Sequence, residues 1–302
     1  MNLRLLFLRS LAGALLCASS PAAICLPGGD TTGSTAFLIR CDDAGMCHAV
    51  NVALREVLDT GMPVSVSVMF ACPWYREAVE TLRQFRHVSV GVHLTLNAEW
   101  KNYRWGPVAG QSAVPSLVDS DGYFFPSRAA LFANRPDTAD VERELGAQIE
   151  RALRTGLRID YLDYHMSAAV STPELRRVVE HLARRYGLGI SRYFGEEDVE
   201  GWYAVSPELK RATLLRVAAA RKGGAPGLLV FHVGLETPEM DALVDMNSFG
   251  LAQMSAHRQA ELRALTSPEF RRLLADRRIR LETYADLIRE RGLDAMKAPR
   301  EN

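Results

Sequence analysis

Short apolar runs alternate along this chain with segments of helical periodicity, and this alternation restricts the fold more than any other feature. Seven runs read as strands, at residues 36–41, 64–70, 87–96, 159–165, 187–191, 227–234 and 279–284. Helical patterns follow several of them, as at 140–155, where Gly156 is a natural helix stop. Repeated β–α units build a parallel sheet with helices outside it. We therefore predict an α/β fold, a distorted TIM-like (β/α) barrel, with a doubly wound open sheet as the alternative.

Two further helices are predicted by their first residues. Thr172 and Ser267 are each followed directly by a proline. A Ser or Thr side chain caps the free N–H groups of a first helical turn, and proline is well tolerated at the next position. We expect helices to begin at these two points, and a last helix over 285–291.

A long segment without regular periodicity interrupts the alternation at residues 97–136. Loops of this length inside a compact domain usually carry function. This one is rich in aromatic side chains, namely Trp100, Tyr103, Trp105, Tyr123 and Phe124. They suit a surface that stacks against sugar rings, and equally a core beneath the loop. We take Trp105 and Tyr123 as candidate substrate contacts.

The charge balance excludes one class of function. The 302 residues include 36 Lys and Arg and 36 Asp and Glu, so the formal net charge is zero. Proteins that bind nucleic acids carry a basic surface, which this composition does not supply. We expect one catalytic domain over 36–292, after a lead-in at 24–35 and before a flexible tail at 293–302.

Residues 1–23 differ from the rest of the chain. They combine two early arginines, an apolar stretch and a small-residue end without a carboxylate. This pattern is typical of a secretory signal peptide and is too short and interrupted for a stable membrane span. We expect export to the periplasm or the extracellular space. Cys25, Cys41, Cys47 and Cys72 would then have three full disulfide pairings open to them, while Cys41 also suits a small core position.

Acidic and imidazole side chains lie near the ends of several expected strands. Asp42 and Asp43 follow the first strand, His93 lies near the end of the third, and later strands bring Asp163, His165 and His232. The carboxyl ends of parallel strands are where barrel enzymes build their active sites. A lone Asp here would more often be a helix cap, and a lone His a core residue. Their conjunction on one face favours a metal or catalytic site.

One carboxylate and two imidazoles form a sensible site for a single divalent ion. Such a set leaves open positions for water and substrate. Water on a divalent ion becomes acidic enough to supply hydroxide near neutral pH. A second, neighbouring carboxylate can then act as the general base. The adjacent Asp pair therefore supplies two roles, a ligand and a base.

At these residues the chain resembles the YdjC-like carbohydrate deacetylases, the family of the chitin-disaccharide (chitooligosaccharide) deacetylases. The matching segments occur in family order: "CDDAG", "SVSVMF", "GVHLTL", "DSDGYFF", "ELGAQIERAL", "YLDYH", "FHVG" and "IRLETYADL". The resemblance implies a distorted, polysaccharide-deacetylase-like barrel and metal-dependent removal of an acetyl group from an acetylated amino sugar.

By the same resemblance, Asp43, His93 and His165 would bind one divalent ion, zinc or magnesium. Asp42 would be the base, and His232 would lie near the reacting group as acid or oxyanion partner. The expected partner is an acetylated sugar or oligosaccharide, without nucleic acid, and we consider a homodimer.

The chain departs from the family pattern beside these residues. Arg40 and Cys41 replace Asn-Ala, Ala44 replaces Phe, Tyr161 replaces a His, and Val233 replaces Pro. The expected ligands remain, so the departures concern substrate contacts, for which we name Arg40, Tyr161 and Asp163. Two other functions stay open. One is a metal-dependent O-acetyl esterase or phosphoesterase, and the other is a carbohydrate-binding protein with a degenerate site.

Overall fold

The computed structural model describes residues 35–299, and this part of the chain contains eight strands, all paired in parallel. The strands are β1 (Ala36–Ala44), β2 (Ser65–Val68), β3 (Ser89–Leu94), β4 (Tyr161–Tyr164), β5 (Gly189–Ile190), β6 (Glu197–Asp198), β7 (Gly227–Phe231) and β8 (Arg280–Glu282). They are ordered β5-β4-β3-β2-β1-β7-β6, and β8 pairs with the start of β1. The predicted distorted (β/α) barrel is confirmed as an open, half-barrel sheet.

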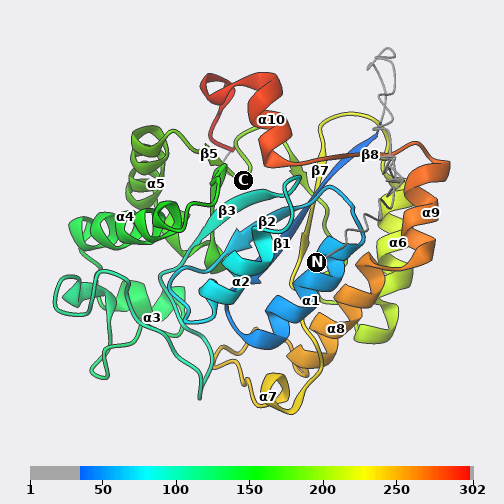
Figure 1. Cartoon of the computed structure of the whole chain (residues 1–302). Helices are drawn as coiled ribbons and strands as arrows, with labels where there is room; N and C mark the ends of the chain where they lie inside the picture. The colour runs from blue at the N-terminus through cyan, green and yellow to red at the C-terminus, as the bar shows by residue number, and fades with distance from the viewer. Residues whose placement is uncertain (1–34, 300–302) are drawn as a thin grey trace, which may run out of the picture. The chain divides into compact units, whose positions relative to one another are not determined.

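Helices connect these parallel strands and pack around the sheet (Figure 1). The α-helices are α1 (His48–Asp59), α2 (Tyr75–Leu82), α3 (Arg128–Ala133), α4 (Thr138–Arg154), α5 (Pro173–Tyr186), α6 (Lys210–Ala220), α7 (Pro238–Asp241), α8 (Met254–Leu265), α9 (Pro268–Asp276) and α10 (Tyr284–Arg291). The 3-10 helices are η1 (Pro115–Leu117), η2 (His165–Val170), η3 (Pro207–Leu209) and η4 (Leu293–Ala295).

The predicted helix ends are confirmed where a local signal marks them. The Thr172 side chain accepts a hydrogen bond from the backbone N–H of Leu175 at the start of α5, and Ser267 caps α9 in the same way. Helix α4 ends at Arg154, and Gly156 follows two residues later with φ +75°. These helix ends can be predicted from the sequence because a cap residue contacts backbone groups only a few positions away.

Strand β1 runs through the middle of the sheet, with β2 on one side and β7 on the other. All nine of its residues are buried: Phe37 and Ile39 belong to the larger core cluster, and Leu38 packs in a second cluster that includes Tyr161 and Tyr284. Cys41 belongs to the larger core cluster, as predicted. In the described residues Cys41, Cys47 and Cys72 are buried free thiols, and Cys25 lies outside them.

The long segment at 97–136 is ordered around α3 and η1 rather than irregular throughout. The Glu144 carboxylate on α4 accepts the backbone N–H groups of Val108 and Ala109, which anchors the segment to the barrel. In the expected tail, Lys297 donates its backbone N–H to the Tyr193 carbonyl. The expected signal peptide at 1–23 lies outside the described residues. Within residues 35–299, no helix combines the length and apolar character that crossing a membrane requires.

Candidate metal centre

The carboxyl ends of β1, β3, β4 and β7 open onto one cleft of about 440 Å³. Its lining includes most of the polar residues that the strand-end pattern singles out: Asp42, Asp43, His93, His165 and His232. The prediction that these five residues share one face is confirmed. Asp163 lies directly beneath them, fully buried, and contacts His93.

The backbone of Asp43 explains how two adjacent side chains reach the same cleft. Successive side chains of a regular strand point to opposite faces. Asp43 has φ +63°, and the pairing of β1 with β2 shifts register between Cys41 and Ala44. This break in the strand lets Asp42 and Asp43 line the cleft together. Left-handed residues other than glycine cost about 1–3 kcal/mol and cluster at functional sites.

The turn that follows the Asp pair is held by Asn51 on α1. Its Oδ1 accepts the backbone N–H of Gly45 at 2.8 Å, and its Nδ2 donates to the Trp74 carbonyl. Gly45 has φ +83°, and a Cβ there would lie 2.7 Å from the Cα of Tyr75. Only glycine fits this turn, because a larger residue would meet both a strained backbone and a steric clash.

Three side-chain atoms form a compact triangle at the centre of the cleft. Asp43 Oδ1 lies 3.3 Å from His93 Nε2 and 3.4 Å from His165 Nδ1, and the two imidazole nitrogens are 3.3 Å apart. Ligand atoms on a tetrahedral zinc ion are about 3.4 Å apart, given bonds of about 2.1 Å. The spacing of this metal triangle (Asp43, His93, His165) therefore fits one small divalent ion.

Each histidine of the metal triangle is oriented by a carboxylate on its other ring nitrogen. His93 Nδ1 lies 2.7 Å from Asp163 Oδ1, and His165 Nε2 lies 3.0 Å from Glu99 Oε2. Such pairs fix the ring and increase its basicity towards a metal. Burial alone would lower the pKa of His93, but Asp163 and Asp42 outweigh it and raise the value to about 10. Burial also opposes protonation of His165, yet Glu99 and Asp43 raise its pKa to about 9.

The local charge balance also fits a divalent cation. The metal triangle and its surroundings contain four buried carboxylates and two buried guanidinium groups; the residues are Asp42, Asp43, Glu99, Asp163, Arg40 and Arg258. With neutral histidines this leaves a net charge of minus two, which one divalent ion would balance. Asp43 Oδ1 is buried and faces only the two imidazole nitrogens of the metal triangle, at 3.3 and 3.4 Å, whereas Arg258 contacts Oδ2 at 2.6 Å. A buried oxygen that makes no close hydrogen bond is available to a metal ion.

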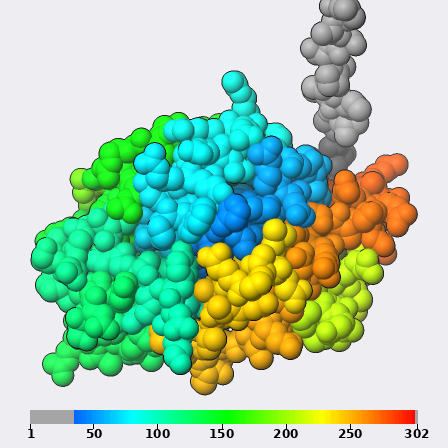
Figure 2. All heavy atoms as spheres, turned by 60° about the horizontal axis from the view of Figure 1, so that its bottom comes forward, coloured from blue at the N-terminus to red at the C-terminus, as the bar shows by residue number. Residues whose placement is uncertain are grey.

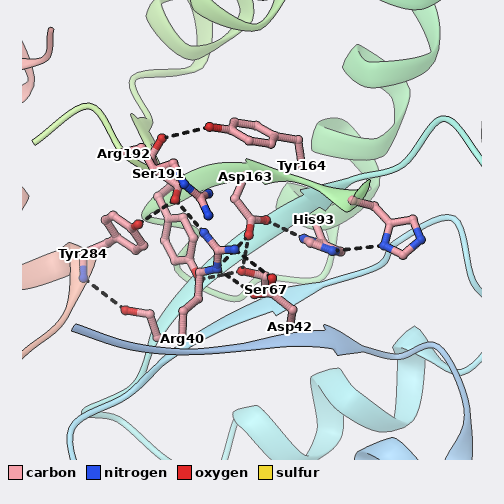
Figure 3. A network of polar contacts seen from close by, with 12 residues as sticks. Arg40, Asp42, Ser67, His93, Asp163, Tyr164, Ser191, Arg192 and Tyr284 are labelled. Carbon is pink, nitrogen blue, oxygen red and sulfur yellow. Dashed lines mark hydrogen bonds and ion pairs between the residues drawn. The ribbon is translucent and has the colours of Figure 1, made fainter. Parts of the chain in front are cut away.

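A second group of three, Asp42, His93 and Asp163, also brings its ligand atoms together. Arg40 excludes a cation there, because its Nε lies 2.6 Å from Asp42 Oδ1 and 2.9 Å from Asp163 Oδ2. Figure 3 shows the Arg40 guanidinium between these two carboxylates and Ser191, which accepts from Nη1 at 2.6 Å. Arg40 therefore already supplies the positive charge at this position.

Replacing Arg40 with methionine is expected to destabilise the fold by about 3–5 kcal/mol, because it leaves two buried carboxylates without their cation. Urea unfolding measures the change. The exposed Arg177, which pairs with Glu174 on α5, serves as the matched control, and Arg177→Met is expected to cost about 0–1 kcal/mol. Equal stability losses in the two variants would contradict the role given to Arg40.

Metal binding near neutral pH is expected to release protons. In the metal-free protein the raised pKa values of His93 and His165 favour protonated imidazole at pH 7, and both rings must be neutral to bind an ion. Affinity should therefore rise with pH up to about pH 9 to 10, where these groups lose their protons. Calorimetric titration with zinc in buffers of different ionisation enthalpy counts the protons, and release of none would contradict the expectation.

The structure places the expected substrate contacts around and beneath the cleft. Trp105 is buried and packs edge-on against the His165 ring, with centroids 6.2 Å apart. Tyr123 is 41% exposed, lies under the Arg104 guanidinium and is not part of the cleft lining. Tyr161 is fully buried and its hydroxyl lies 2.8 Å from Ser67 Oγ. Of the five expected substrate contacts, Arg40 lines the cleft. Asp163 and Tyr161 lie beneath the cleft, where both contact Ser67.

His232 lies just after β7 and is held through its backbone. Its N–H donates to Glu261 Oε2 at 2.7 Å, and the other oxygen of Glu261 accepts from Lys210 Nζ at 2.8 Å. The Tyr203 ring packs edge-on against the imidazole, with centroids 5.5 Å apart. His232 Nδ1 is buried without a hydrogen-bond partner. These contacts fix the position of His232 at the wall of the cleft.

Two residues at the metal triangle were missed by the sequence reasoning. Glu99 follows the third strand by five residues, inside the long loop, and Arg258 lies on α8. Neither stands at a strand end, so the pattern that found the other residues could not find them. The one sequence signal at Glu99 is a carboxylate within the aromatic-rich loop, next to Trp100, and its partner His165 is 66 positions away.

Comparison with known proteins shows the family of this chain. A carbohydrate deacetylase of Thermus thermophilus is 32% identical over 271 residues, which cover 81% of this chain and 91% of that protein. One from Enterococcus faecalis is 31% identical over 153 residues, 50% of this chain and 56% of that protein. A solved Enterococcus faecalis structure named for cellobiose-phosphate cleavage superimposes with TM-score 0.69 at 25% identity, covering 84% of this chain and 99% of that one. The model of the YdjC-like protein family matches residues 36–276, and this chain belongs to that family.

Proposed function

We propose that this chain is a metal-dependent N-deacetylase that removes the acetyl group of an N-acetylated amino sugar in a glycan or glycolipid. The observation that carries the proposal is the metal triangle at the floor of an open cleft, with Asp42 beside it. The relatives named as carbohydrate deacetylases support the reaction class. Zinc suits two imidazoles and one carboxylate better than magnesium does, because magnesium prefers oxygen ligands.

The residues around the metal triangle can divide the chemistry of amide hydrolysis. An ion bound by Asp43, His93 and His165 would supply Lewis acidity to water and to the acetyl carbonyl. Asp42 accepts a proton as the water oxygen adds to the carbonyl carbon. The C–N bond then breaks, acetate forms, and His232 donates a proton to the leaving amine.

Arg40 gives Asp42 a fixed orientation for this role. The Nε and Nη2 groups of Arg40 each donate to one oxygen of the Asp42 carboxylate, at 2.6 and 2.7 Å. A carboxylate oxygen has two lone pairs, so an oxygen that accepts from Arg40 retains one for a water proton. We therefore assign Arg40 to positioning the base, in addition to the substrate contact expected from the sequence.

An acetate-release assay tests the proposed reaction. The purified protein is incubated with N-acetylated and O-acetylated sugars, before and after chelation, and its bound metal is measured by mass spectrometry. We expect acetate and free amine in equal amounts, loss of both after chelation, and recovery with zinc. Release from O-acetyl sugars alone would favour the esterase. Sugar binding without turnover, unchanged in Asp42→Asn, would favour a degenerate binding protein.

We further propose that the protein acts outside the cytoplasm, in the periplasm or beyond. The support is the composition of residues 1–23, with early arginines, an apolar stretch and a small-residue end. Fractionation of the producing cells, followed by N-terminal sequencing, tests this placement. Full-length protein in the cytoplasmic fraction would contradict it.

A further inference from the structure

The segment that leads from α7 to α8 exposes an unusual amount of apolar surface. Val244, Met246 and Phe249 are 52%, 41% and 67% exposed, and they lie within six positions of one another. Eight large apolar residues are exposed in the described part of the chain, and these three form the densest group of them along the sequence. We call them the apolar strip. Burying such side chains against a partner would release water and gain free energy.

The apolar strip adjoins the catalytic cleft. Phe249 lines the cleft itself, while Val244 lines a neighbouring cavity of about 550 Å³. The two cavities share Asp245, Gly250 and Met254 as walls, so they adjoin each other. A ligand whose reacting group lies at the metal triangle would extend along this shared wall.

The apolar strip is also held at a fixed place next to the metal triangle. Met246 donates its backbone N–H to the Glu99 carbonyl at 2.9 Å, and the Val244 carbonyl accepts from Lys101 at 2.9 Å. The Glu99 side chain contacts His165, so the strip is attached to a residue of the site. Figure 2 shows the gold surface of this region beside the blue-green surface of the long loop. Its exposed side chains therefore present a preformed surface to the substrate.

The walls of the neighbouring cavity indicate the chemistry of its occupant. They carry Glu236, Asp241 and Asp245 but neither lysine nor arginine. A phosphate or other anion would be repelled there, because it would meet carboxylates without a cation. The remaining walls include Leu243, Leu251 and Met254. A neutral hydrocarbon group fits this combination.

We propose that the apolar strip and the neighbouring cavity bind a neutral hydrocarbon aglycone attached to the acetylated sugar, so that the substrate is a glycolipid. The inference rests on the proposed deacetylase function, because the sugar must lie at the metal triangle. It narrows the substrate class from glycan or glycolipid to a sugar with an apolar substituent.

The test compares methyl and octyl glycosides of N-acetylglucosamine, the latter below its critical micelle concentration, with N,N′-diacetylchitobiose. Burial of several methylene groups should raise kcat/KM for the octyl glycoside at least about tenfold over the methyl glycoside, mainly through KM. Phe249→Ser and Val244→Ser should each reduce this octyl-to-methyl ratio several-fold. Leu153→Ser, which alters an exposed leucine of α4 remote from both cavities, should leave the ratio intact.

The outcomes separate the two proposals. Turnover of all three compounds without an octyl preference would overturn the aglycone site and leave the deacetylase function standing. A preference for chitobiose that depends on Phe249 would make the surface a sugar subsite instead. If none of the compounds releases acetate, the deacetylase proposal fails. Calorimetric binding of the same glycosides to the wild type and to Phe249→Ser then decides the aglycone site directly, and equal affinities would overturn it.

Discussion

Alanine in place of His93 or His165 is expected to remove metal binding and, with it, turnover. Each histidine supplies one of the three atoms of the metal triangle, which lie 3.3 to 3.4 Å apart. Loss of one ligand should reduce metal affinity by more than the roughly 10- to 100-fold cost of losing an outer partner. Metal content after gel filtration, together with acetate release, measures the effect.

Matched variants separate ligation from other roles of a histidine. His181 is half-exposed on α5 and pairs with Glu142, so His181→Ala should keep both metal and activity. Asp163→Asn and Glu99→Gln alter the outer partners of the two histidine ligands. Their metal affinity should lie between that of the His181→Ala control and that of the ligand variants, about 10- to 100-fold below the wild type. Circular dichroism of each variant distinguishes metal loss from unfolding. A folded His93→Ala protein with a full complement of metal would refute the ligand assignment.

The architecture was predictable because its signals are local. Apolar runs bounded by helix caps give the parallel sheet, and the caps at Thr172 and Ser267 act within one turn. The sequence carries no comparable local signal for helices α6 and α8. Helix α8 buries Arg258 and Glu261 as well as Leu262, so its inward face is not apolar and lacks the one-sided pattern that predicts a surface helix. Strand β6 has two exposed residues and shows no apolar run.

The metal triangle was predictable for a different reason. Parallel strands end at the same edge of a sheet, so the strand assignment predicted that Asp43, His93 and His165 share one face. Their choice as the three metal ligands came from the resemblance to the YdjC-like family. The partners of these residues depend on contacts that no local rule encodes. Arg258 reaches Asp43 from 215 positions away.

The surroundings of Tyr161 illustrate the same limit. The ring of Tyr161 occupies the space that Gly91 leaves open on the adjacent strand, where a Cβ would lie 2.5 Å from the aromatic ring. The ring also packs on Tyr284, with centroids 4.2 Å apart. Its place beneath the cleft follows from this packing between elements, whereas the family pattern suggested a substrate contact.

Asparagine in place of Asp42 is expected to leave metal binding intact and to lower kcat by about 10²- to 10⁴-fold, the usual contribution of a general base. Metal binding should persist because the metal triangle does not include Asp42, and the carboxamide oxygen can still accept from Arg40. The lost function is proton acceptance, since an amide has no basic oxygen near neutral pH. Metal content and acetate release, measured on the same sample, test both parts.

The comparison with Asp43→Asn makes the division of labour within the Asp pair testable. Asp43 and Asp42 are neighbours, equally buried, and each contacts an arginine, Arg258 or Arg40. Loss of metal in Asp43→Asn, set against retained metal in Asp42→Asn, would reflect ligation and not charge alone, because both variants remove one negative charge. Asp121→Asn, at an exposed loop position, controls for the substitution itself. Full activity in Asp42→Asn would overturn the base assignment, and the proton would then have to leave through another group that lines the cleft, where Glu99, Asp198 and Asp245 are the other carboxylates besides Asp43.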